Sequence, residues 1–308
     1  MTRIVAIGEC MVEMAPVATK GQFCLGYAGD TLNTAWYLRR LLGASDQIDY
    51  FTAVGTDAVS DKMIDFLQQA GIGTRYILRR DDKGVGLYMI QLQNGERSFS
   101  YWRSDSAARS LAARPAPLQA ALDGADLAYF SGITLAILPS EDRTRFLTVL
   151  RWFRDSGGRV VFDPNLRPKL WASPQEMTEA VMQAAAISDI ALPSYDDEAQ
   201  WFGDENPAAT LERYLRAQGG CCVVKNGADR LLVAEGGQRF GCDPNPDVRV
   251  VDSTAAGDSF NAGFIAARLQ GAGLRDAVQV GASLAAQVVA KRGALVETAL
   301  PKEAVNRG

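Results

Sequence analysis

Histidine is absent from this chain of 308 residues. Its absence excludes Ser-His and Cys-His triads, histidine-ligated zinc and imidazole acid–base catalysis together. The five cysteines show no paired metal-ligand spacing, so we expect reduced thiols, mostly packed as small hydrophobic side chains: Cys10, Cys24, Cys221, Cys222 and Cys242. Any proton transfer must therefore fall to a carboxylate, a lysine, a tyrosine or a cysteine.

Long apolar runs and an excess of basic residues are also missing. No run approaches the ~20 apolar residues that span a bilayer, and the apolar stretch Ile4–Ile7 is too short for a signal-peptide core. The formal net charge of −4 argues against a nucleic-acid binder. These absences predict a soluble, cytoplasmic protein without a membrane or nucleic-acid partner.

Two common phosphate-binding motifs are missing as well. The glycine pairs at 71/73, 84/86 and 271/273 lack the third glycine of the dinucleotide fingerprint, and the chain has no Gly-Lys-Ser/Thr of a P-loop. This disfavours a nicotinamide dehydrogenase. A phosphate site would have to be built in another way.

Short apolar runs alternate with helical patterns, and no linker divides residues 1–308, which predicts one α/β domain with a mostly parallel sheet and helices on both faces. The expected strands are 3–8, 50–54, 127–131, 159–163, 187–192, 221–225 and 230–234. The expected helices lie near 31–42, 57–70, 140–155, 207–218, 255–270 and 274–291. Ligands of such folds bind beyond the carboxyl ends of the strands. Four polar candidates lie there: Asn165, Arg167, Ser194 and Lys225.

One stretch interrupts this alternation. Asn94-Gly95 joins the extended runs Gly84–Gln93 and Glu96–Arg103, which predicts a hairpin with a two-residue loop. Tyr88 then faces Tyr101, and Arg103 lies on the same face. The alternative is an edge hairpin whose aromatic side chains pack on the core and whose arginine is solvated.

The segment Val251–Gly263 is the most informative part of the chain. A turn of small residues, 254–257, leads into a helical pattern, so the first backbone N–H groups of the helix can bind an anion such as phosphate. Asp258 lies in the first turn of that helix. A carboxylate beside a phosphate site suits phosphoryl transfer to a hydroxyl. The alternative is a capped helix with an acidic first turn.

The stretch Asp252–Phe260 resembles the C-terminal motif of the ribokinase-like (PfkB) family of carbohydrate kinases. Ala255 replaces a glycine of that motif, and we expect it to keep a negative φ. Gly29–Ala35 resembles the family's sugar-binding motif, with Ala28 in place of its first glycine. The resemblance covers nearly the whole chain. It implies a three-layer α/β/α sandwich with a mostly parallel sheet and a small β-lid, formed by segments near 10–27 and 84–103.

Within the family the resemblance is to bacterial kinases of 2-keto-3-deoxygluconate, through Gly8–Met14, Tyr101–Arg103, Ser131–Leu138 and Asp163–Arg167. It implies transfer of the γ-phosphate of ATP to the C6 hydroxyl of that sugar acid. Asp258 would be the base, and the anion hole would comprise Ala255, Ala256 and Gly257. Substrate would contact Gly29, Asp30, Asn33, Tyr88, Tyr101, Arg103, Arg167 and Asp258.

An acidic substrate needs a cation, and a guanidinium suits a carboxylate; Arg103 and Arg167 are the candidates. Arg167 could instead pair with Asp163 or with an ATP phosphate. Fructokinase or another sugar kinase of the same family is the first alternative function. A non-catalytic sensor of sugar acids is the second, although a sensor has no need of Asp258.

The resemblance also implies ATP and Mg²⁺. The expected ATP contacts are Asn165, Ser194, Lys225, Gly227, Asp229, Ala256 and Gly257, although 225–229 could be a simple turn between strands. The family's Asn-x-x-Glu metal motif appears as Ser194–Asp197 with both end residues changed. Asp197 is the metal candidate, with the adjacent Glu198 as alternative. A requirement for a monovalent cation and assembly of copies through the β-lid stay open.

Overall fold

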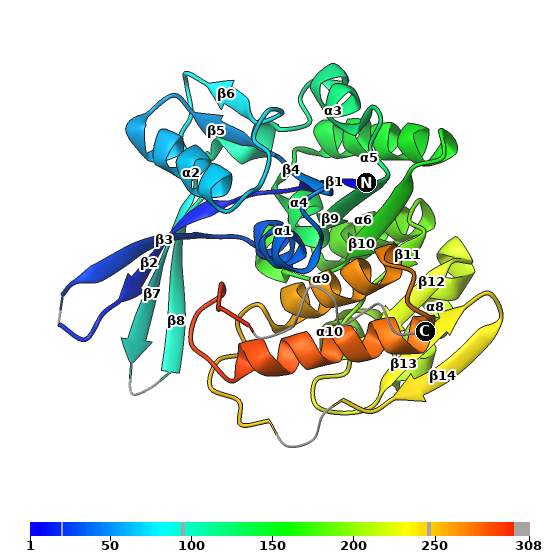
Figure 1. Ribbon diagram of the computed structural model, residues 1–308. Coiled ribbons are helices and arrows are strands. Elements are labelled where there is room, and N and C mark those ends of the chain that lie inside the picture. Colours follow the sequence, from blue (N-terminus) through cyan, green and yellow to red (C-terminus); the bar gives the residue numbers. More distant parts are fainter. Residues whose placement is uncertain (20, 94–95, 245–247, 299–308) are drawn as a thin grey trace.

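The computed structural model describes residues 1–19, 21–93, 96–244 and 248–298 (Figure 1). Its central sheet has the strand order β14-β13-β12-β11-β10-β9-β1-β4. The six strands from β12 to β4 are parallel, and β13 and β14 are antiparallel additions at one edge. The strands are β1 Arg3–Ile7, β4 Gln47–Phe51, β9 Leu127–Ser131, β10 Arg159–Asp163, β11 Ile190–Ala191, β12 Cys221–Val224, β13 Leu231–Glu235 and β14 Gln238–Cys242.

Both faces of this sheet are covered by helices. In β1, Ile4 and Ala6 belong to one apolar cluster, whereas Val5 and Ile7 belong to the other, as the alternation of a strand requires. One face packs against α1 Asp30–Leu41, α2 Ala58–Gln69, α9 Ala256–Leu269 and α10 Leu274–Val289. The opposite face packs against α3 Pro115–Leu122, α4 Gly132–Ile137, α5 Ser140–Asp155, α6 Pro174–Ala186, α7 Tyr195–Phe202 and α8 Pro207–Gln218. The expected three-layer α/β/α sandwich is confirmed.

The β-lid is a separate sheet with the order β3-β2-β7-β8, and it projects from the body at the left of Figure 1. Its strands are β2 Met11–Pro16, β3 Phe23–Ala28, β7 Leu87–Gln93 and β8 Glu96–Trp102. The predicted hairpin register is confirmed, because Tyr88 pairs with Tyr101. Their ring centroids lie 5.8 Å apart. The Asn94-Gly95 loop itself lies outside the described residues.

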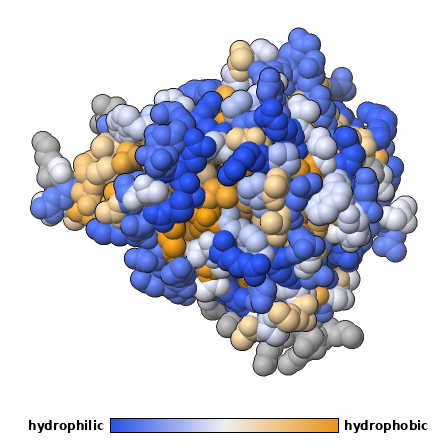
Figure 2. All heavy atoms as spheres, turned by 90° about the horizontal axis from the view of Figure 1, so that it is seen from above, coloured by the Kyte–Doolittle hydropathy of each residue, from blue (hydrophilic) through white to orange (hydrophobic). Residues whose placement is uncertain are grey.

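The two faces of the lid differ in what they contact. On the inner face, Tyr88 and Ile90 are buried in a small apolar cluster against which Ala255, at the start of α9, packs. The outer face carries exposed apolar side chains, Leu25 and Trp102 among them. Figure 2 shows apolar surface gathered at the same end of the molecule. The lid therefore reaches the predicted anion hole with its tyrosine face.

Several expected boundaries were wrong. The expected strand 50–54 is divided between β4 and β5 Ala53–Gly55, which pairs with β6 Leu78–Arg80 in a sheet of its own. The division occurs at Thr52, whose carbonyl accepts a hydrogen bond from the Leu78 N–H rather than from a neighbour in the main sheet. The expected strand 187–192 shortens to β11, because Ile187 is the C-cap of α6. The pattern did not predict α3, α4, α6 and α7.

The start of α9 also differs from expectation. Ala255 has φ +59° and is the N-cap of the helix, in the left-handed region that favours glycine. The expected negative φ was wrong. The Ala256 N–H closes the preceding turn by donating to the Ser253 carbonyl at 3.2 Å.

We predict that Ala255→Gly raises the free energy of unfolding by about 1 kcal/mol. The left-handed region costs an alanine about 1–2 kcal/mol, part of which returns as the greater chain entropy of unfolded glycine. Urea denaturation followed by circular dichroism measures the change. Ala256→Gly is the matched control. It lies in the first turn of α9, where glycine should destabilise by up to ~1 kcal/mol. Equal destabilisation by both substitutions would contradict a strained Ala255.

Candidate active site

The predicted base lies where the first turns of two helices meet. Asp258 is in the first turn of α9, and its carboxylate accepts a hydrogen bond from the Asn33 amide of α1 at 2.8 Å. The Asp258 side chain is buried, with a relative exposure of 9% for the residue. Burial is the main cause that raises the pKa of Asp258 to about 8, and Asp30 and Asp163 add to it. The Asn33 hydrogen bond and the Lys225 charge act in the opposite direction.

The predicted anion hole has fewer free backbone N–H donors than expected. Among the described residues, the backbone N–H groups of Ala255, Gly257 and Asp258 have no acceptor, as is usual for the first turn of a helix. The N–H of Ala256, expected in the hole, is the exception because it is bonded to Ser253. Three donors thus remain for an anion, beside the Asp258 carboxylate.

The sugar-binding motif forms the beginning of α1. A Cβ on Gly29 would lie 2.2 Å from the carbonyl oxygen of Glu9, so only glycine allows this close approach of two backbone segments. Asp30 accepts hydrogen bonds from the Thr31 N–H and from the Asn165 amide, both at 2.8 Å. Asn165, expected at the nucleotide, is therefore joined to a predicted sugar-binding carboxylate.

Two predicted substrate contacts on the hairpin are already paired with acids. The Tyr88 hydroxyl donates to the Glu13 carboxylate, and Arg103 forms an ion pair with Glu9. Glu9 is buried and also accepts a hydrogen bond from Ser106. The Arg103 side chain is only 10% exposed, so the alternative of a solvated arginine was wrong.

The Nε of Arg103 is buried without a hydrogen-bond partner among the described residues. A buried donor without an acceptor costs roughly 1–3 kcal/mol, so this group is suited to an incoming oxygen. Tyr101, its neighbour on β8, is half exposed on the inner face of the lid. Glu9 and Glu13 were not predicted as site residues, although both lie within the Gly8–Met14 stretch that supported the resemblance.

The two metal candidates, Asp197 and Glu198, differ in their exposure to solvent. The Asp197 carboxylate lies 3.6 Å from the Arg167 guanidinium, and both side chains are partly exposed. Arg167 therefore pairs with Asp197 and not, as one alternative had it, with Asp163. Glu198 is fully buried, bonded to Arg213 and Tyr214, which excludes it as an accessible metal ligand. Burial raises the pKa of both carboxyls, for Glu198 to about 7.

Lys225 connects the nucleotide loop to the anion hole. Its ammonium lies 3.3 Å from both oxygens of Asp163 and 3.2 Å from the Asn261 amide oxygen. Its backbone forms a β-bridge with Ser194. Gly227 and Asp229 follow in an exposed turn between β12 and β13, in agreement with the simpler alternative for that loop. Asp163 and Asn261 were not predicted as site residues.

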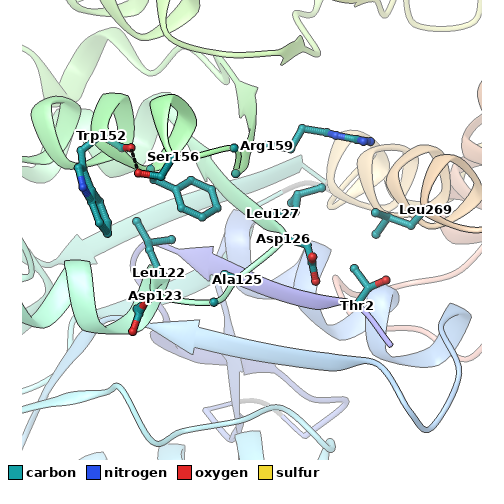
Figure 3. A pocket seen from close by; sticks show the side chains of 14 residues that line it. Thr2, Leu122, Asp123, Ala125, Asp126, Leu127, Trp152, Ser156, Arg159 and Leu269 are labelled. Atoms are coloured by element: carbon teal, nitrogen blue, oxygen red, sulfur yellow. Dashed lines mark hydrogen bonds between the residues drawn. The ribbon is translucent and has the colours of Figure 1, made fainter.

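A cavity of about 490 Å³ lies away from these residues, at the amino ends of the strands of the central sheet. It is lined by residues at the amino ends of β1, β9 and β10, and Figure 3 shows Trp152 and Leu122 on one side of it and Leu269 on the other. Asp258 and Lys225 do not line it.

The helices of the described residues include none with the length and apolar character that a membrane span requires.

Comparison with known proteins identifies a carbohydrate kinase family. The family model described as pfkB family carbohydrate kinase matches residues 1–301. The chain is 41% identical to 2-dehydro-3-deoxygluconokinase of Haemophilus influenzae, with 96% of each chain covered. It is 42% identical to the protein of the same name from Dickeya dadantii, covering 95% of this chain and 96% of that one.

A solved structure of a putative Ribokinase II from E. coli, in complex with ATP and Mg²⁺, has a TM-score of 0.81 at 22% identity, covering 96% of this chain and 94% of the other. This likeness establishes the ribokinase-like fold. The family match over residues 1–301 contradicts the alternative of a nicotinamide dehydrogenase. The chain, matched over residues 1–301, belongs to the pfkB family of carbohydrate kinases.

Proposed function

We propose that residues 1–308 act as one kinase domain that transfers the γ-phosphate of ATP to the C6 hydroxyl of 2-keto-3-deoxygluconate, also called 2-dehydro-3-deoxygluconate. ATP as phosphate donor follows from membership of the family. The names of the relatives at 41% and 42% identity support the sugar acid. The observation that carries the proposal is the buried Asp258 carboxylate beside three backbone N–H groups without acceptors.

In the proposed reaction, an Asp258 carboxylate oxygen takes the proton of the C6 hydroxyl as its oxygen attacks the γ-phosphorus. The new O–P bond forms while the bond to the β,γ-bridging oxygen breaks, and its electron pair leaves on ADP. The N–H groups of Ala255, Gly257 and Asp258 stabilise the charge on the transferring phosphoryl. The lid excludes water that would otherwise hydrolyse ATP.

The sugar would bind between α1 and the inner face of the lid. Gly29, Asp30 and Asn33 hydrogen-bond its hydroxyls. The keto-acid end contacts four side chains: Tyr88, Tyr101, Arg103 and Arg167. The free Nε of Arg103 supports a contact with an anionic oxygen, because that donor has no partner in the described structure.

The nucleotide would bind on the Lys225 side. The proposed contacts are Asn165, Ser194, Lys225, Gly227, Asp229, Ala256 and Gly257. Mg²⁺ would be held by the phosphates and, through water, by Asp197, which is partly exposed whereas Glu198 is buried. Among the described residues, no three acidic or cysteine side chains form a metal cluster. A bound divalent cation supplies charge that offsets the phosphates.

One observation favours the alternative of a neutral sugar, as in fructokinase. Glu9 already balances the charge of Arg103, and the Glu13 carboxylate faces Tyr88 on the same wall. A panel of 2-keto-3-deoxygluconate, fructose, ribose and 5-ketogluconate in an ATP-consumption assay decides between them. Preference for a neutral sugar would overturn the proposed substrate but not the kinase activity.

The exposed outer face of the lid supports assembly of copies through Leu25 and Trp102. This assembly and a requirement for a monovalent cation stay predictions.

We predict that Asp258→Asn lowers kcat by roughly 10²–10⁴-fold, the usual contribution of a positioned base, while sugar binding persists. In wild type, kcat/KM should fall as the pH is lowered through about 8, because protonation of Asp258 removes the base. Steady-state kinetics from pH 6 to 9 tests both effects, and calorimetry tests sugar binding. Turnover within a few-fold of wild type would overturn the mechanism.

We predict that EDTA abolishes activity and that Mg²⁺ or Mn²⁺ restores it, because the acidic site offers few cations to offset the phosphates. Asp197→Asn should raise the Mg²⁺ concentration needed for half-maximal rate. Glu205→Gln is the control, because Glu205 is exposed in the loop after α7. Full activity in metal-free buffer would refute the metal requirement.

We predict that Arg103→Ala lowers kcat/KM for 2-keto-3-deoxygluconate by about 10- to 150-fold, from loss of a charge-assisted contact of roughly 1.5–3 kcal/mol. Activity on a neutral sugar should change far less. Because the substitution leaves Glu9 as a buried unpaired charge, the double variant Glu9→Gln/Arg103→Ala is measured beside it. Equal losses on acidic and neutral sugars in the double variant would mean that Arg103 serves the fold.

A further inference from the structure

Lys225 directly follows the carboxyl end of β12 and lies on the side of the site where phosphate is proposed to bind. A Cβ built on Gly257 would lie 3.5 Å from the Lys225 ammonium nitrogen, so the ammonium contacts the first turn of α9. The Lys225 side chain is 10% exposed. A lysine is rarely buried unless it is paired, and here its partners are Asp163 and Asn261.

Two side chains fix the ammonium. The Asp163 carboxylate, at the carboxyl end of β10, receives it symmetrically at 3.3 Å, and the Asn261 amide oxygen receives it at 3.2 Å. Asn261 also donates to Asp163 at 2.7 Å and to the Tyr129 hydroxyl at 3.1 Å, which orients its oxygen toward the lysine. An ammonium has three N–H donors. In the described structure these donors face three acceptor oxygens, two of Asp163 at 3.3 Å and one of Asn261 at 3.2 Å, so a ligand oxygen has to displace or share one of them.

The Lys225 ammonium is surrounded by negatively charged side chains. Asp163 and Asp258 are both buried, and the charges of Asp30 and Asp163 both raise the pKa of Asp258. A phosphoryl group entering the anion hole adds more negative charge. Lys225 is the cation that lowers the pKa of Asp258.

We propose that the Lys225 ammonium, held by Asp163 and Asn261, is a catalytic group that contacts the oxygens of the phosphoryl as it moves from ATP to the sugar hydroxyl. The three N–H groups of the α9 turn face that phosphoryl from one side, and the ammonium adds a full positive charge next to Gly257. Charge spreads over the equatorial oxygens in the transition state, so a fixed cation acts most strongly there. Asp163 and Asn261 are positioning residues. The proposal rests on phosphoryl transfer at Asp258, but not on which sugar is the acceptor.

The test is Lys225→Met, which removes the ammonium and keeps most of the apolar stem. We expect kcat to fall by about 10²–10³-fold while KM for ATP and for the sugar changes less than about threefold. The acid limb of kcat/KM should also move to higher pH, because the cation that opposes protonation of Asp258 is gone while Asp30 and Asp163 remain. Lys62→Met, on the exposed side of α2, is the control and should match wild type.

Two further measurements keep the result interpretable. Thermal unfolding and calorimetric binding of a non-hydrolysable ATP analogue establish that Lys225→Met is folded. For Lys225→Ala, added ethylammonium chloride should restore part of kcat, as expected if a free cation can re-enter the site, whereas sodium chloride at equal ionic strength should not.

A kcat within a few-fold of wild type would overturn the proposal. So would a rise in the KM for ATP at unchanged kcat, since that result assigns the lysine to ground-state binding. All rates are measured on the best sugar of the wild-type panel. Rejection of 2-keto-3-deoxygluconate by wild type therefore overturns the proposed substrate and leaves the test of Lys225 intact.

Discussion

The Asp258 carboxylate, buried between the first turns of α1 and α9, is the constraint on which the rest of the site depends. A charged group removed from water needs partners, and the site meets this need with the Asn33 amide and the nearby Lys225 ammonium. The same burial raises its pKa to about 8, which gives the carboxylate a higher proton affinity than an exposed aspartate. A group with that property is useful as a base and costly for the fold; Asn33 and Lys225 reduce this cost, whereas Asp30 and Asp163 add to it.

In the β-lid the buried charged group is a cation, and it is likewise paired. The buried guanidinium of Arg103 is balanced by the buried Glu9, and the buried phenol of Tyr88 is bonded to Glu13. Glu9 lies where the chain passes from β1 to β2, and its backbone touches Gly29 at the start of α1. The sugar-binding turn, the lid and the body therefore meet at one residue. In the proposed function, recognition of an acidic sugar depends on the Arg103 donor that Glu9 does not use.

Local features of the chain were predicted from sequence because their causes are local. The hairpin register came from a two-residue turn between two extended runs, and the pairing of Tyr88 with Tyr101 confirmed it. The alternating pattern of apolar runs and helices was enough to predict the α/β sandwich. The position of Asp258 in the first turn of α9 also followed from the segment 251–263. The resemblance to a kinase family rested on the same short stretches.

Tertiary structure alone decided how distant residues meet. Lys225 lies 62 positions from Asp163 and 36 from Asn261, and no periodicity in the chain indicates that their side chains converge under the anion hole. The pairing of Arg103 with Glu9, 94 residues away, likewise depends on where the lid crosses the body. Ala255 adopts a positive φ because the turn into α9 demands it, against the preference of an alanine. The fold class, the hairpin register and the place of Asp258 in the first turn of α9 followed from the sequence; packing decided which charges neutralise one another, because electrostatic partners are chosen by distance in space and not along the chain.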